Sequence, residues 1–277
     1  MSFSEQSVET FHRLGAELEI LIRPATFPLA VKLAREEKDI PPECRRPKQV
    51  FGVQNFVCQN FKIARTYGWT MAVTEQDINC YLARNIYGWD PVTEETIQAA
   101  HAFNIGLYAR DMETSKKLEA HLFRPAEPLH GLVIAPLTRT RVAPDVVLIY
   151  CLPAQAMRLI HGYLFIRGGA LSFSATGRIG SCHEGVIKTV VTGEPQLVLL
   201  GNGDRVWGGA QDAEVMFACP AGKLEMLVDG LKQTHAAGLR YPVPVYMNYS
   251  PGFQDDFEKR ALDRAGRTIV RPEESDK

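Results

Sequence analysis

The chain has 277 residues, of which 45% are hydrophobic and 23% are charged, and it carries a formal net charge of −1. This length and composition allow a full hydrophobic core without crosslinks, and six cysteines are too few for a disulfide scaffold. The balanced charge argues against a dedicated nucleic-acid surface, and the longest apolar stretch, 146–153, is too short to cross a bilayer.

In the first half of the chain, the spacing of apolar residues predicts alternating helices and strands. Ser4 to Ile22 has apolar residues three or four positions apart, which is typical of an amphipathic helix. Leu29 to Leu33 predicts a buried strand, and Cys58 to Tyr67 predicts a helix that ends at Gly68, because glycine readily adopts a positive φ. A loop is expected at 35–49, strands at 70–73, 105–109 and 132–135, and helices from Asp90 and from Asp111.

The second half, from Pro144, predicts a similar alternation. Val146 to Tyr150 is an apolar, β-branched run of the kind found in buried strands. Ser181 and Glu184 have the spacing of a capping box, which would put Cys182 at the first position of a helix. Further helices are expected from Pro153 and Pro220, and strands at 171–175, 197–200 and 215–218.

The two halves also carry a similar pattern around their cysteines. The spacing from Cys58 to Cys80 equals the spacing from Cys182 to Asp204, and each stretch holds a helix and then an apolar strand. We therefore predict an α+β fold of two similar α/β halves from an internal duplication, with mixed sheets packed against helices. The alternative is coincidence in an ordinary α+β chain. The predicted parts are an N-terminal helix at 1–27, the two halves at 28–140 and 141–238, and a proline-rich, charged tail at 239–277.

A duplicated unit that pairs across a pseudo-twofold axis would bring its cysteine-bearing helix starts to one centre. Unpaired N–H groups at a helix start stabilise a thiolate, which is the form of cysteine that binds metal. We therefore predict an iron–sulfur or metal site at Cys58, Cys80 and Cys182, with Asp204 and Arg205 nearby. The alternative for each of these cysteines is a small, buried apolar residue.

Several charged residues predict an anion site. Arg65 and Arg205 could both hold an anion, and these two residues and Asp204 are the candidate cofactor-binding residues. Asp204 and Arg205 could equally form a local ion pair. Lys32 lies inside an apolar strand, where it needs a partner, a function or an edge position. His183 follows a candidate cysteine and could tune it or take its proton; the alternative is a solvent-facing helix residue.

Common catalytic and nucleotide-binding motifs are absent from the sequence. There is no Cys-x-x-Cys pair, no His-Glu-x-x-His, no Gly-x-x-x-x-Gly-Lys loop and no Gly-x-Ser-x-Gly elbow. Gly201 and Gly203 lack the third glycine of a dinucleotide-binding loop, so no nucleotide cofactor is predicted. Cys151 and Cys219 lie in apolar runs and are expected in the core.

The chain contains the segments VKL, VCQNFKIARTYG, PDVVLIYCLPAQAMRLI, SCHEGVIKTVVTG and GNGDRVWGGAQDAEVMFACP. In these segments, between about Pro28 and Leu231, it resembles the domain of unknown function 169 family. The resemblance implies a protein type found largely in archaea and anaerobic bacteria, without a settled activity, and with cysteines at the three candidate positions. Many members carry Cys-x-x-Cys-Arg where this chain has Gly201 to Arg205. Both of these cysteines are absent here, so this chain departs from a four-cysteine pattern and leaves a three-cysteine site with Asp204, water or substrate as the fourth ligand.

Three functions are compatible with these patterns. The leading hypothesis is a protein with an iron–sulfur or metal site, the second is an enzyme or carrier that binds a small anionic metabolite, and the third is an accessory protein with a degraded site. The first 19 residues lack the apolar block of a secretory signal, so we expect a cytoplasmic protein without membrane or nucleic-acid partners. A homodimer is compatible with the repeat but is not specified by it.

Overall fold

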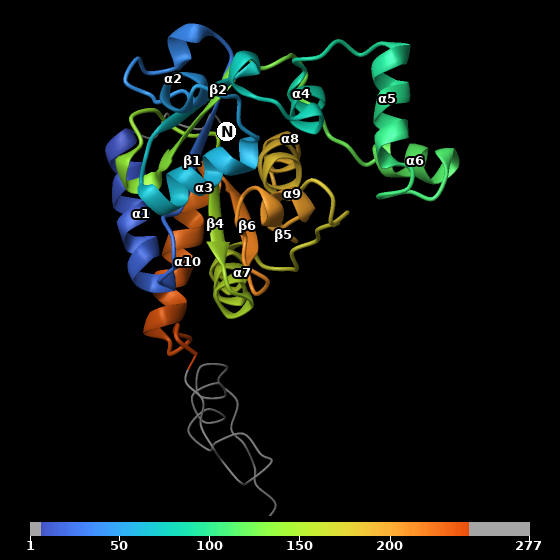
Figure 1. Cartoon of the computed structure of the whole chain (residues 1–277). Coiled ribbons are helices and arrows are strands. Elements are labelled where there is room, and N and C mark those ends of the chain that lie inside the picture. The colour runs from blue at the N-terminus through green and yellow to red at the C-terminus, as the bar shows by residue number, and fades with distance from the viewer. Residues whose placement is uncertain (1–6, 244–277) are drawn as a thin grey trace, which may run out of the picture. The chain divides into compact units, whose positions relative to one another are not determined.

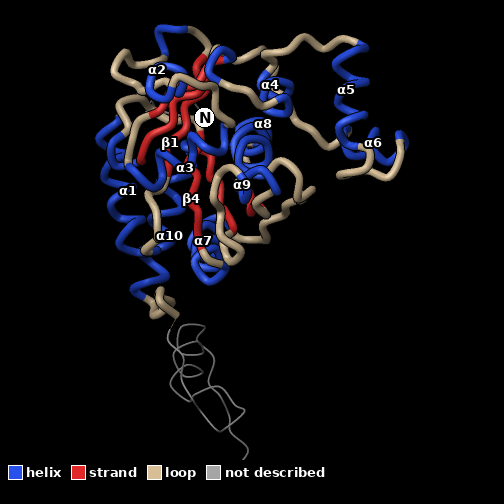
Figure 2. The backbone as a smooth tube through the Cα atoms, viewed as in Figure 1, coloured by secondary structure: helices blue, strands red, loops and turns tan. Residues whose placement is uncertain are grey.

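A single sheet of six strands lies at the centre of residues 7–243, the part of the chain that the computed structural model describes (Figures 1 and 2). The strand order is β2-β3-β1-β4-β6-β5, and every pairing is antiparallel. The predicted α+β class is confirmed. The strands form one antiparallel sheet instead of mixed sheets, because an apolar run does not encode the direction of its neighbours. The strands are β1 (Leu29–Ala34), β2 (Met71–Thr74), β3 (Gly131–Pro136), β4 (Val146–Cys151), β5 (Gln196–Val198) and β6 (Val215–Pro220).

The strands of the two halves pair in the same order. In the first half β1 pairs with β3 and β3 with β2, and in the second half β4 pairs with β6 and β6 with β5. Strands β1 and β4 join the halves, with Leu29 opposite Leu148. Both β3 and β6 end in a proline, Pro136 or Pro220, that leads into a 3₁₀ turn. This shared order is compatible with the internal duplication, which itself stays a prediction.

Helices cover both faces of the sheet. In β4, Val147 and Ile149 pack with the helices of one face, whereas Val146 and Leu148 pack with those of the other. Both faces of the strand are buried, which explains why its sequence is apolar throughout. The first face carries α1 (Val8–Ile22), α7 (Pro153–Arg167) and α10 (Leu224–Ala236), and the second carries α3 (Val57–Tyr67), α4 (Tyr81–Tyr87), the π-helix η4 (Gly180–Ile187) and α8 (Lys188–Thr192).

Two further helices, α5 (Glu94–Asn104) and α6 (Met112–Glu119), stand away from the sheet (Figure 1). The side chains of Thr93 and Asp111 cap their N-termini. The strand predicted between them, at 105–109, is wrong. The chain turns there, and the Asn104 carbonyl accepts hydrogen bonds from the three backbone N–H groups of 107–109. A short apolar segment becomes a strand only where a neighbouring strand offers a ladder of hydrogen bonds.

The strand predicted at 171–175 is also wrong. The segment is irregular, and its backbone is tied to α8 by Lys188, whose Nζ donates to the carbonyl and the hydroxyl of Ser174 at 2.9 and 2.7 Å. Phe173 and Ala175 are exposed like the serines between them, so the alternation does not mark a buried face.

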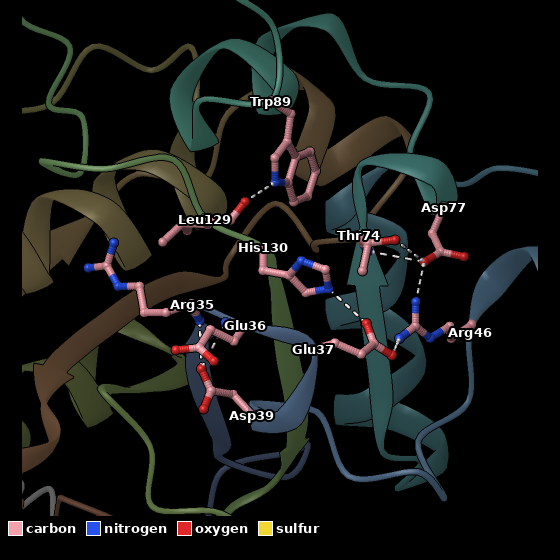
Figure 3. A network of polar contacts seen from close by, with 10 residues as sticks. All are labelled: Arg35, Glu36, Glu37, Asp39, Arg46, Thr74, Asp77, Trp89, Leu129 and His130. Carbon is pink, nitrogen blue, oxygen red and sulfur yellow. Dashed lines mark hydrogen bonds and ion pairs between the residues drawn. The ribbon is translucent and has the colours of Figure 1, made fainter.

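A polar network fastens the charged segment at 35–49 to the edge of the sheet (Figure 3). Glu37 pairs with Arg46 at 2.6 Å and with His130 at 2.7 Å. Asp77 Oδ2 accepts hydrogen bonds from the N–H and the hydroxyl of Thr74. The predicted loop is partly helical, since it includes a 3₁₀ turn (Glu37–Asp39) and α2 (Pro47–Phe51).

The remaining expectations concern the ends of the chain. The first predicted helix is present from Val8, and its residues 4–6 lie outside the described residues, as does the predicted tail from 244 onward. Residues 7–243 belong to one folded unit. Within these residues, no helix is both long and apolar enough to cross a membrane.

Candidate functional site

Three thiols and one carboxylate lie at the starts of four helical segments. Cys58 is the second residue of α3, Cys80 immediately precedes α4, and Cys182 is the third residue of η4. Asp204 is the third residue of α9 (Asn202–Val206). Helices α3, η4 and α9 contact one another, and α4 contacts η4 (Figure 1). The fold thus brings together side chains that are far apart in the sequence.

The ionisation of these groups is coupled. Burial raises the pKa of the Cys182 thiol well above its usual value, and the nearby Asp204, Cys80 and Cys58 raise it further. Burial and then Asp204 and Cys80 likewise raise the pKa of Cys58. A negative charge on one member disfavours a negative charge on the next, so the set resists holding several thiolates by itself.

Backbone N–H groups oppose this effect only in part. Those of Cys58 and Gln59 favour the Cys58 thiolate, and those of Leu82 and Ala83 favour the Cys80 thiolate, but burial outweighs them and both pKa values are raised. The Cys58 thiol donates a hydrogen bond to the Gly203 carbonyl at 3.3 Å. The N–H groups at these helix starts therefore favour the thiolates, as expected, but desolvation is the larger effect.

Asp204 is held by backbone N–H groups of η4 and of the residue that precedes α9. Its Oδ2 accepts hydrogen bonds from the N–H groups of Ser181 and Gly201 at 3.2 and 3.0 Å. A Cβ atom at Gly180 would lie only 2.4 Å from that oxygen, so the close approach requires glycine. The Ser181 hydroxyl, in turn, shares a hydrogen bond of 2.7 Å with Tyr150 Oη in the central strand β4.

The capping box predicted at Ser181 and Glu184 does not form. Ser181 lies inside η4, and the Glu184 carboxylate instead accepts hydrogen bonds from the N–H and the hydroxyl of Thr176, both at 2.7 Å. Cys182 is consequently not the first residue of its helix. The sequence pattern was misleading because Thr176, in the preceding loop, supplies the hydrogen-bond donors for Glu184.

The cations that the sequence proposed for an anion site have protein partners. Arg65 forms two hydrogen bonds with the Glu214 carboxylate, at 2.7 and 3.2 Å, and its guanidinium lies 4.1 Å from the centre of the Tyr150 ring. Arg205 donates to the Gln211 carbonyl at 2.8 Å, and Lys32 pairs with Asp145 at 3.2 Å.

Two buried residues near Cys182 have unused polar atoms. The Arg178 side chain is 1% exposed and pairs with Glu119 at 2.7 Å through Nη1, whereas its Nε and Nη2 have no hydrogen-bond partner in the described structure. His183 Nε2 accepts a hydrogen bond from the Phe123 N–H at 2.8 Å, which leaves Nδ1 to carry the proton of the neutral ring, and within residues 7–243 nothing accepts from Nδ1. Burial, Lys188 and Arg124 lower the pKa of His183 to about 4.

His183 is therefore not the solvent-facing residue that the sequence allowed as an alternative, since it is only 1% exposed. Sequence reasoning missed Arg178, because a single arginine in a loop rich in serine and glycine gives no sign of burial. Its pairing with Glu119 links two segments that are distant in the chain.

Comparison with known proteins identifies the family of the chain. A model of the domain of unknown function 169 (DUF169) family, described as an uncharacterised ArCR, matches residues 17–230. The chain belongs to the DUF169 family. The chain is also similar to the uncharacterized protein MJ0308 of Methanocaldococcus jannaschii, with 25% identity over 216 residues, which cover 78% of this chain and 90% of that protein. No solved structure matches the chain.

The other thiols of this DUF169 protein lie apart from the set. Cys151 in β4 and Cys219 in β6 are buried in the core, as predicted, and burial raises the pKa of each to about 12. Within the described residues, no three His, Cys, Asp or Glu side chains are arranged to hold one metal ion.

Proposed function

We propose that this DUF169 protein carries an iron–sulfur cluster on Cys58, Cys80 and Cys182, with Asp204 beside it as a candidate fourth ligand. The observation that carries the proposal is the convergence of these side chains from four helix starts, with mutual effects on their pKa values. Cysteine thiolates are the protein ligands that iron–sulfur clusters use most. A cluster would also supply the positive charge that three coupled thiolates need.

A cluster suits these residues better than a single ion. Zinc binds thiolate sulfur at about 2.3 Å in a tetrahedron, which requires the sulfur atoms to lie about 3.8 Å apart. Among the described residues, no three such side chains are arranged to hold one metal ion. A cluster sets iron and sulfide between the thiolates and so tolerates larger separations. Hydrogen bonds from backbone N–H groups at Cys58 and Cys80 would tune its reduction potential.

Such a cluster would supply electron transfer or Lewis-acid chemistry. The protein's own part is to hold the ligands and limit water around them, since Cys58, Cys80 and Cys182 are each only partly exposed. Binding requires the loss of the thiol protons, so cluster assembly should become more favourable as pH rises.

Anaerobic purification followed by iron and sulfide analysis tests the proposal. We expect about two or four iron atoms, with sulfide, per chain in the wild-type protein. The variants Cys58→Ala and Cys182→Ala should lose most of both, while Cys219→Ala, which removes a core thiol, should keep them. Wild-type protein that contains no iron or sulfide after anaerobic reconstitution would refute the proposal.

A second candidate function, binding of a small anionic metabolite, is favoured by Arg178 and His183. Their unused donors are Arg178 Nε–H and Nη2–H and His183 Nδ1–H, all buried, and the positive charges of Lys188, Arg124 and Arg178 act on His183. The Nε and Nη2 edge of an arginine is the fork that binds a carboxylate or phosphate with two hydrogen bonds.

Calorimetric titration with succinate and with inorganic phosphate tests this second function. We expect saturable binding that Arg178→Lys weakens, because lysine cannot reproduce the two-donor fork. Arg205→Lys is the matched control and should leave binding unchanged. Absence of binding by both anions would remove the candidate without affecting the proposal of a cluster.

A further inference from the structure

The two helices that stand away from the sheet carry a surface of their own. The arm, residues 93–120, comprises α5, α6 and the turn between them (Figure 1). It is fixed to the rest of the molecule at two points. Tyr81 Oη donates a hydrogen bond to the Thr96 carbonyl at 2.6 Å, and Glu119 at the end of α6 pairs with the buried Arg178 at 2.7 Å. The fold therefore sets the position of the arm.

The arm lacks a hydrophobic core. None of its residues belongs to a hydrophobic cluster of the described residues. The two helices instead meet through polar side chains. His101 Nδ1 and the Ser115 hydroxyl share a hydrogen bond of 2.8 Å, and Asn104 Nδ2 donates to the same hydroxyl at 3.0 Å. Helices this short are only marginally stable unless they bury an apolar face, so the arm needs a further contact.

Apolar side chains of the arm are exposed where the chain passes from α5 to α6. The exposed fraction lies between 39% and 70% for the four residues of this tip patch, Phe103, Ile105, Leu107 and Met112. They lie close together, because the Asn104 carbonyl accepts hydrogen bonds from the N–H groups of 107–109 and closes a tight turn. Single exposed apolar residues are common, whereas a group of them indicates an interaction surface.

The area of the tip patch matches one side of a dimer interface. At about 200 Å² for a fully exposed large side chain, the patch offers on the order of 400 Å² of apolar surface. In an interface of standard size each partner contributes about 800 Å², of which somewhat more than half is apolar. The patch and the charged residues around it thus supply the area and the composition that a stable dimer needs.

The charges beside the patch favour a second copy of this chain as the partner. Helix α6 has Asp111 and Glu113 at its start and Lys116 and Lys117 in its last turn. Two such helices in antiparallel contact place the acidic half of each against the basic half of the other. The exposed pair of Lys117 and Glu113 within one helix contributes little, so these side chains can pair across a contact instead. A strongly acidic or strongly basic partner would meet repulsion as well as attraction.

We propose that the chain forms a homodimer in which the tip patches of two copies pack together across a twofold axis, with their α6 helices antiparallel. Such a contact is closed, because each copy buries its patch against the same patch of the other. Leu107, the most exposed member of the patch, is buried in the dimer, and the charged side chains of α6 form the rim.

Sedimentation equilibrium of the full chain, at concentrations up to about 100 μM, tests the dimer. We expect an equilibrium between monomer and dimer. Leu107→Glu should raise the dissociation constant at least about 100-fold, because both copies would bury a carboxylate without a partner. The matched control is Ile20→Glu, since Ile20 is 72% exposed on α1, outside the arm. This control should leave the dissociation constant unchanged.

Charge reversal on α6 tests the antiparallel arrangement and is independent of Leu107→Glu. Glu113→Lys and Lys117→Glu should each weaken the dimer about ten-fold, because like charges then face each other. An equimolar mixture of these two variants should regain the wild-type affinity, because a more basic α6 then faces a more acidic one. A chain that stays monomeric, a dimer that Leu107→Glu leaves intact, or a mixture that dissociates like the single variants would each overturn the proposal. None of these results depends on whether the protein carries a cluster.

Discussion

Replacing Gly180 by alanine is expected to destabilise the protein by about 3 kcal/mol. The new Cβ would lie 2.4 Å from Asp204 Oδ2 and 2.9 Å from the Gly201 nitrogen, so the carboxylate must move. That movement breaks charge-assisted hydrogen bonds from Ser181 and Gly201, which together are worth about 1.5–3 kcal/mol. Overpacking adds about 1–3 kcal/mol, and the helical preference of alanine returns about 1 kcal/mol.

Equilibrium urea unfolding, followed by circular dichroism, measures this change. In a thermal scan the same loss corresponds to a fall in Tm of about 6–12 °C. The matched control is Gly203→Ala, because no atom of the described residues lies within 4 Å of its would-be Cβ. Its stability should stay the same or rise by up to about 1 kcal/mol. If Gly180→Ala is as stable as Gly203→Ala, the close contact between η4 and Asp204 is not as described.

Further predictions concern the buried Arg65 pair and the core thiols. Arg65→Met should cost about 3–5 kcal/mol in urea unfolding, since Glu214 would be left without its partner, and a cost below about 1 kcal/mol would contradict the pairing. Burial alone would raise the pKa of Glu214, but hydrogen bonds from Arg65 and the Gln211 N–H outweigh it and lower the pKa. The stability from this pair is therefore present above the unfolded-state value of about 4.5 and is lost as pH falls through the lower folded-state value. Unfolding from about pH 6 to about pH 3 should thus show a smaller loss for Glu214→Gln than for the wild type, and equal losses would contradict this. Cys151 and Cys219 should escape iodoacetamide at about pH 8 until urea unfolds the chain, because burial raises the pKa of each to about 12; mass spectrometry that finds them labelled in the native protein would contradict their place in the core.

The elements that the sequence predicted correctly are those with a strong local signal. The helix that ends at Gly68 and the strand at Val146 to Tyr150 follow from a positive-φ glycine and from a continuous apolar run. The segments 105–109 and 171–175 carried a strand-like pattern and still failed, because pairing depends on a neighbour that local sequence does not encode. The direction of the strands was not predictable for the same reason.

The candidate site, too, was predictable from the sequence only in part. The repeat led to Cys58, Cys80, Cys182 and Asp204 as one group, and their helices do meet. The sequence allowed burial of each cysteine as an alternative, but it could not predict that burial would outweigh the helix N–H groups, since this depends on packing from both halves. Arg178 was missed because a lone arginine in a serine- and glycine-rich loop gives no sign of burial, and its partner Glu119 is distant in the chain.

X-ray absorption at the iron edge of anaerobically isolated protein tests the central claim most directly. We predict sulfur atoms as the main neighbours of iron together with a second shell of iron, and a clear loss of this signal in Cys182→Ala. A spectrum with only oxygen and nitrogen around iron, or one unchanged by that substitution, would contradict a cluster on these thiols.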